Sequence, residues 1–249
     1  RLGNIKLYAY IPTGFGNLTP EPSSRPEPES PKSEKKPIPD TYPSIRPDDW
    51  PSDASPYLFI DAFPNSKGNL RFFDFKKHES WIMAHILSLP IGTPLFPDSS
   101  IRNNTLTLFC AEKADAPKRQ ICKFAGSGIF GFGDCGWSQL GWKGVFYPQV
   151  LNSILPRIVS FAYQYFTECL EPTDKAWFHV KLGNISGCER KTERIGAIPP
   201  KKFIYDRDIS VFEQFDFKNG NQDLLIKSLY DKAMIESELD PQKWGYRTE

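Results

Sequence analysis

The sequence has few of the residues on which metal and acid–base chemistry depend. Its 249 residues include three histidines, and none of its five cysteines forms a Cys-x-x-Cys pair with another. An odd number of cysteines without that spacing argues against both a complete disulfide framework and a zinc ribbon. We therefore predict reduced thiols, a cytoplasmic location, no metal and no cofactor. The five cysteines are Cys110, Cys122, Cys135, Cys169 and Cys188.

Long apolar runs and a charge excess are also absent. The most apolar stretch, Trp81–Ile91, is interrupted by His85 and Pro90 and falls far short of the roughly 20 residues that cross a bilayer. The formal net charge is +1, which is too small to attract the whole molecule to DNA or to an anionic membrane. The sequence predicts no membrane partner. Because it opens at Arg1 without a Met, we expect that the true start has been removed or that the chain is a piece of a longer polypeptide.

Enough apolar surface is present to build a core, since 39% of the residues are hydrophobic and 14% are aromatic. Strand-like and helical segments follow one another without regular βαβ alternation, which favours an α+β fold with a mixed or antiparallel sheet and about three helices. Residues 19–56 form a long Pro-rich insertion near the N-terminus, expected to be a linker or surface loop. The predicted organisation is an N-terminal strand of the main sheet in residues 1–18, this linker, and a globular α+β domain in residues 57–249.

Hydrophobic periodicity locates the elements of that domain. Residues 57–63 and 70–75 are expected to pair as a β-hairpin across a turn-rich segment. Further strands are predicted at Thr105–Cys110, Gln120–Phe124, Ala176–Leu182 and Ile209–Phe217. Helices are predicted from Trp81 to Leu89, from Pro148 to Leu170 with a kink or a new start at Pro156, and from Gln222 to Leu239 with Asn221 as the N-cap.

Seven glycines lie within residues 126–144, the most unusual segment of the chain. Gly126, Gly128 and Gly131 satisfy Gly-x-Gly-x-x-Gly, but further glycines prevent the helix that a dinucleotide site requires. We interpret the segment as a loop whose aromatics Phe130, Phe132, Trp137 and Trp142 look exposed. Such aromatics beside cations suit single-stranded nucleic acid or another flat anionic ligand, whereas packing of the loop on the core is the simpler alternative. The candidate ligand-binding residues are Lys118, Arg119, Lys123, Gly126, Gly128, Gly131, Gly133, Trp137, Trp142 and Lys143.

The histidines suggest two further hypotheses. His78 and His85 share a helix face, so a metal bound with Cys110 or Asp74 is one interpretation and packing at the core edge is the other. His179 lies mid-strand and is a candidate base for a Cys135 or Cys188 nucleophile. The sequence does not bring these residues together, and no catalytic residue is assigned.

The function we expect is a non-catalytic interaction or ligand-recognition module of a larger intracellular protein or assembly. Its partners would be another protein or other domains of the same polypeptide. The alternative is a single-stranded RNA- or DNA-binding module that uses residues 118–144. A second alternative is an enzyme with a Cys/His site.

Overall fold

The structure is a computed structural model in which described residues are separated by gaps. They are residues 56–65, 75–85, 98–110, 120–134, 145–146, 151–170, 174–190 and 204–241. Residues 1–55, and with them the expected N-terminal strand and almost all of the Pro-rich segment, lie outside these ranges. Among the described helices, none has the length and apolar character needed to span a bilayer.

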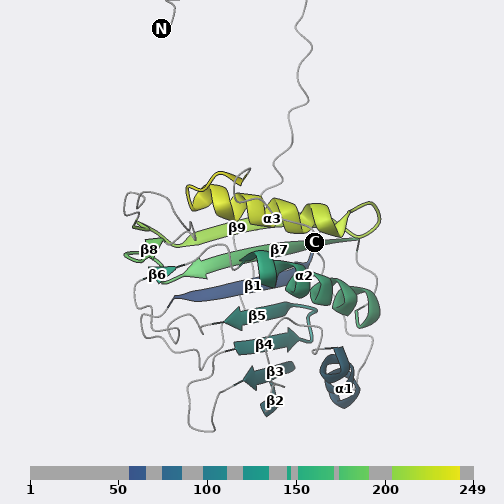
Figure 1. The fold of residues 1–249 in the computed structure, drawn as a ribbon. Coiled ribbons are helices and arrows are strands. Elements are labelled where there is room, and N and C mark those ends of the chain that lie inside the picture. The colour runs from purple at the N-terminus through teal and green to yellow at the C-terminus, as the bar shows by residue number, and fades with distance from the viewer. Residues whose placement is uncertain are drawn as a thin grey trace, which may run out of the picture. The chain divides into compact units, whose positions relative to one another are not determined.

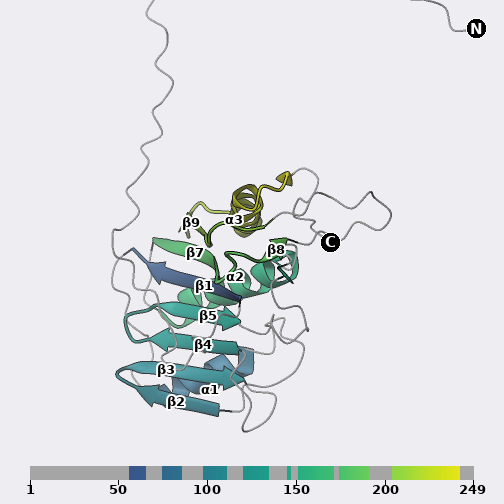
Figure 2. The same cartoon turned by 90° about the vertical axis from the view of Figure 1, so that its left-hand side faces the viewer.

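A seven-stranded antiparallel sheet is the centre of the fold (Figure 1). Its order is β2-β3-β4-β5-β1-β7-β9, so β1 lies between strands from two distant parts of the chain. Strands β2 to β5 form a meander of successive neighbours, which Figure 2 shows side by side. The strands are β1 (Tyr57–Pro64), β2 (Asp98–Arg102), β3 (Thr105–Cys110), β4 (Gln120–Ala125), β5 (Phe130–Asp134), β7 (Lys175–Gly183) and β9 (Ile209–Asp216). A separate parallel pair joins β6 (Val145–Phe146) to β8 (Glu189–Arg190).

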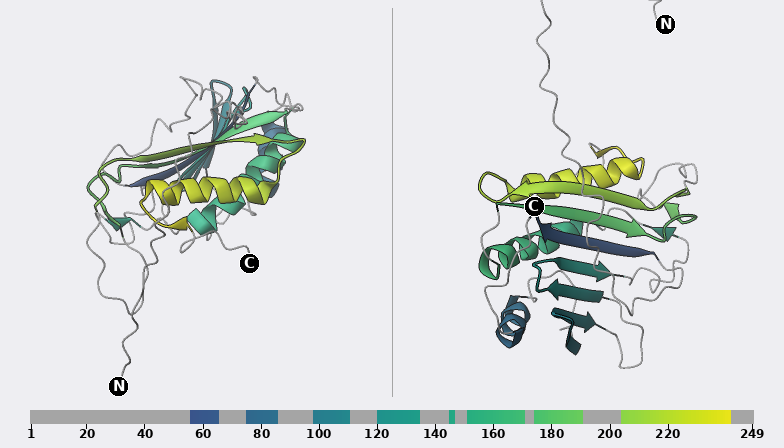
Figure 3. Two further views of the ribbon diagram at one scale, coloured as in Figure 1. Left: turned by 90° about the horizontal axis from the view of Figure 1, so that it is seen from above. Right: turned by 180° about the vertical axis from the view of Figure 1, so that it is seen from behind.

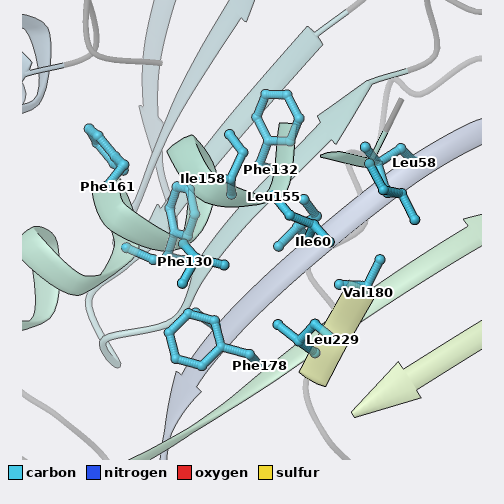
Figure 4. Close-up of a cluster of buried hydrophobic side chains, with 14 of the residues drawn as sticks. Leu58, Ile60, Phe130, Phe132, Leu155, Ile158, Phe161, Phe178, Val180 and Leu229 are labelled. Carbon is cyan, nitrogen blue, oxygen red and sulfur yellow. The ribbon is translucent and has the colours of Figure 1, made fainter. Parts of the chain in front are cut away.

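Three helices, α1 (Phe75–His85), α2 (Leu151–Glu168) and α3 (Gln222–Glu236), lie on one face of the sheet (Figures 1 and 3). Alternate strand residues point toward them, and Figure 4 shows this core, in which Leu58, Ile60 and Phe178 lie close to Leu155 and Leu229. The α+β class with an antiparallel sheet is therefore confirmed. Pro156 lies inside α2, which runs through it from Leu151, so no new helix begins there.

The glycine-rich segment does not form one loop, because its first part continues into β5. Phe130 and Phe132 are 0% and 1% exposed and pack in the core beneath the helices. The expectation that these two aromatics are exposed is wrong. Period-2 alternation turns both phenylalanines to the core and the glycines that follow them, Gly131 and Gly133, to the opposite side of the sheet.

The expected hairpin between residues 57–63 and 70–75 is also wrong. Strand β1 pairs with β7 along its whole length on one edge and with β5 on the other, while residues 70–74 lie outside the described residues. Phe75 instead begins α1. The apolar run correctly predicted the strand β1, but the strands that pair with β1, β5 and β7, lie far along the chain.

Local signals at the C-terminal helix are confirmed. The Asn221 side chain caps α3, since its Oδ1 accepts hydrogen bonds from the backbone N–H groups of Asp223 at 2.8 Å and Leu224 at 3.2 Å. Lys232 on α3 donates to the carbonyl oxygen of Phe212 and pairs with Glu213. Strand β9, at one end of the sheet, is in this way tied to the helix that follows it.

Candidate functional site

Three strands bring an aspartate, a histidine and a serine together on the face of the sheet that does not carry the helices. We call this the opposite face. Asp61 on β1 and His179 on β7 are directly paired in the register, and Oδ2 of Asp61 lies 3.2 Å from Nδ1 of His179. The other ring nitrogen, Nε2, lies 2.8 Å from Oγ of Ser210 on β9. Each residue follows or precedes a core-facing neighbour, so strand alternation aims all three side chains to the same side. We call this arrangement the Asp61–His179–Ser210 array.

Burial changes the acid–base properties of the array. Asp61 is 0% exposed and His179 is 1% exposed, whereas Ser210 is exposed. Desolvation raises the pKa of Asp61 well above its ordinary value, and the nearby positive charge of Lys181 opposes that rise. Burial, assisted by Lys181, lowers the pKa of His179 to about 3. His179 is therefore uncharged at neutral pH.

Packing fixes the imidazole. The ring of Phe212 stacks on the ring of His179 with centroids 4.2 Å apart and planes 17° apart. Phe212 is the residue directly paired with His179 across β7 and β9. The histidine is held at both nitrogens and over one ring face, so its orientation is set before any ligand arrives.

One oxygen of the array has no partner. Oδ1 of Asp61 is buried and makes no hydrogen bond within the described part of the chain. Leaving a buried acceptor unsatisfied costs about 1–3 kcal/mol of stability. A group of this kind in a folded protein calls for an explanation, and an absent ligand donor is one.

On the β5 side of Asp61, the opposite face carries glycines, and Gly131 and Gly133 are buried. The register places Asp61 beside Gly131, and Gly131 beside Lys123 of β4. In the neighbouring row Gly133 lies beside Phe59. The buried Gly131 therefore lies between Asp61 and Lys123 in one row of the sheet.

The structure brings together part of the site that the sequence predicted. Lys123, Gly131 and Gly133 share the opposite face, while Gly126 and Gly128 form the turn between β4 and β5. Gly128 has a φ of +87°, a conformation that glycine adopts without strain. The other predicted residues, Lys118, Arg119, Trp137, Trp142 and Lys143, lie outside the described residues.

The metal hypothesis on α1 gains no support from the described residues. His78 is buried against the rings of Phe124 and Tyr165, and burial lowers its pKa to about 4. His85 stacks on Trp81, with Nδ1 2.7 Å from the Trp81 carbonyl oxygen. Within the described ranges no group of three His, Cys, Asp or Glu side chains is placed to hold a metal ion.

The proposed pairing of His179 with Cys188 is wrong. Both nitrogens of His179 lie against Asp61 and Ser210, and the Cys188 thiol instead donates to the Asn184 carbonyl oxygen at 3.8 Å. Burial and the nearby charge of Asp208 raise the pKa of Cys188, which makes its thiolate scarce. Cys135, the other candidate nucleophile, lies outside the described residues.

Sequence reasoning did not identify Asp61 or Ser210. A signal for Asp61 existed, because it is the one charged residue in the eight-residue strand Tyr57–Pro64 and that strand has six buried residues. A lone carboxylate in such a run indicates a buried polar contact. Nothing in the local sequence distinguishes Ser210 from other strand serines. Comparisons of the chain with protein families, with curated proteins and with solved structures found no match.

Proposed function

We propose that this chain is a ligand-recognition module whose binding site lies on the opposite face of the sheet, at the buried carboxyl group of Asp61. The observation that carries the proposal is the buried, unpartnered Oδ1 of Asp61 beside Gly131 of β5. Folding gains nothing from an unsatisfied carboxyl oxygen, whereas a ligand donor placed there regains the lost hydrogen bond. Binding of this kind requires no turnover.

The chemistry of the surface describes the ligand. A hydrogen-bond donor would meet Oδ1 of Asp61, and an anionic group would lie toward Lys123, two strands away. Strands are spaced by about 4.8 Å, so the Cα atoms of these residues are roughly 10 Å apart. A polar molecule the size of a dipeptide or a nucleoside monophosphate spans that interval.

Within the cell, we place this module in the cytoplasm as part of a larger protein or assembly. The cysteines Cys122, Cys169 and Cys188 are free thiols in the structure, as expected for a reducing compartment. Contacts with a protein partner or with other domains of the same polypeptide belong to this proposal as well.

Binding of single-stranded nucleic acid is the weaker alternative. Phe130 and Phe132 are buried and so cannot stack on bases. Of the cations in residues 118–144, Lys123 is the one that lies among the described residues. The same experiment tests both functions, because an oligonucleotide is included among the probes.

The three histidines make the experiment specific. Long-range ¹H–¹⁵N spectra would show one set of imidazole signals for each histidine, and single His→Gln variants would assign these signals. We expect a dipeptide or a nucleoside monophosphate to shift the His179 signal saturably, because a ligand donor at Asp61 perturbs the carboxyl group that contacts Nδ1. The His85 signal, from the helix on the other face, is the internal control.

Asp61→Leu is the matched variant, since it keeps the approximate size of the side chain and removes both acceptor oxygens. The shift should disappear in this variant while the fold remains. A shift that survives the substitution, or His179 signals unmoved by every small probe, would contradict recognition at Asp61. A response to a dT oligonucleotide alone would favour the nucleic-acid alternative.

A further inference from the structure

The order of contacts in the Asp61–His179–Ser210 array is that of acyl-transfer enzymes. A carboxyl oxygen contacts Nδ1, and Nε2 of the same ring contacts a serine hydroxyl, at 3.2 Å and 2.8 Å. Such constellations occur on unrelated folds and are recognised by geometry and by role rather than by position in the sequence. The array meets the geometric requirement for a nucleophile with an adjacent, oriented base.

The three residues of the array differ in their exposure to solvent. Asp61 and His179 are buried, while Ser210, at the end of the chain of contacts, is exposed on β9. The exposed position gives a reagent access to this residue.

From this arrangement we infer that Ser210 is a nucleophile, activated by His179 and oriented by Asp61, that accepts an acyl group from carboxylic esters. The inference goes beyond ligand recognition and does not depend on the ligand of that proposal.

The reaction requires an ester and water and no other reactant. Oγ of Ser210 attacks the carbonyl carbon, and its proton passes to Nε2 of His179 while the Nδ1 proton remains directed at Asp61. The bond to the alcohol oxygen then breaks, and the alcohol leaves with the proton from Nε2. Water hydrolyses the acyl-serine by the same route, which restores Ser210 and releases the carboxylic acid.

Lys181 is a cationic residue beside the reacting serine. It is directly paired with Ser210 across β7 and β9, where Cβ atoms are about 4.5–5.5 Å apart. Its Nζ also lies 5.9 Å from the centre of the Tyr57 ring. An ammonium group at this place favours the oxyanion of the tetrahedral intermediate, so Lys181 acts as an electrostatic stabiliser.

The test treats the full chain with a fluorophosphonate and locates the adduct by intact and peptide mass spectrometry. We expect one phosphonyl adduct per chain, on Ser210, with loss of fluoride and a proton. Ser210→Ala should abolish it. Ser186→Ala is the matched control, because Ser186 is an exposed serine whose hydroxyl donates to the Asp206 carbonyl oxygen and contacts no histidine in the described structure.

His179→Gln should slow labelling by about 100-fold or more, the size of a general-base contribution. The rate of p-nitrophenol release from p-nitrophenyl acetate should fall in parallel. No adduct on Ser210, or an adduct that forms equally fast without His179, overturns the inference. Binding of a dipeptide or nucleotide at Asp61 would be unaffected by that failure, since it is measured on the His179 signal of unlabelled protein.

A second measurement covers the case in which His179→Gln does not fold. Ser210→Cys leaves the histidine in place, and a thiol beside a base reacts as a thiolate. We expect its alkylation by iodoacetamide at pH 6.5 to exceed that of Ser186→Cys by at least about 10-fold, as mapped by mass spectrometry. Equal rates at the two positions would show that the array does not activate residue 210.

Discussion

His179 and Asp61 face each other across β7 and β1, with the histidine Nδ1 3.2 Å from the carboxyl Oδ2, although 118 residues separate them in the chain. Burial pushes the two groups in opposite directions, since it raises the pKa of Asp61 and lowers that of His179. Both shifts disfavour charge on the opposite face. The stability of the fold should therefore depend on pH through identifiable residues.

The first prediction concerns Asp61→Asn. The folded-state pKa of Asp61 lies above its unfolded value, so its contribution to stability is present at low pH and is lost as the pH rises through the folded pKa. Relative to wild type, the variant should gain stability at pH 8, by about 1–3 kcal/mol, and gain less at pH 4. Urea unfolding at the two pH values measures the difference. A variant less stable than wild type at pH 8 would assign Asp61 a structural role.

The second prediction concerns acid stability and His78. Its folded pKa is lowered to about 4, so the stability it contributes is present above pH 6.5 and is lost as the pH falls toward 4. His78→Phe, which keeps a ring against Phe124 and Tyr165, should reduce the loss of stability between pH 7 and pH 4 by up to about 3 kcal/mol. His85→Gln on the same helix is the control. Identical acid sensitivity in wild type and His78→Phe would contradict the assignment.

The third prediction tests the placement of the glycine-rich segment in the sheet. Phe132 is 1% exposed and packs in the core, so Phe132→Ala should cost about 3–5 kcal/mol of unfolding free energy. The same substitution of an aromatic residue in a solvated loop would change the unfolding free energy very little. Chemical denaturation followed by circular dichroism separates the two outcomes, and Leu224→Ala, at a 65% exposed position on α3, is the control with little expected change.

The fourth prediction concerns the cap of α3. Asn221→Ala removes the acceptor for two backbone N–H groups and should cost about 1 kcal/mol. Asn221→Ser or Asn221→Asp should recover most of that loss, because both side chains accept the same bonds. Thermal unfolding of the three variants measures the order of stability, and equal stability of Ala and Ser would show that the cap contributes nothing.

Segments whose signals are local were predictable from the sequence. The strand Thr105–Cys110 agrees residue for residue, and α3 begins at Gln222 after its Asn221 cap, because both depend on side chains within a few residues. The apolar periodicity of α2 likewise identified a buried helix. Patterns of this kind indicate which residues enter the core without naming their partners.

Contacts between distant strands could not be read in the same way. Glycine is a poor strand residue, so the local sequence did not predict β5. The structure shows it as a strand because it pairs with β1 on one side and with β4 on the other. The Asp61–His179–Ser210 array depends on the register of β1, β7 and β9, and a slip of one residue in any of them would turn its member into the core. Local sequence therefore specified the elements and their buried faces, whereas long-range strand pairing specified which polar side chains meet, because register is a property of two strands and not of one.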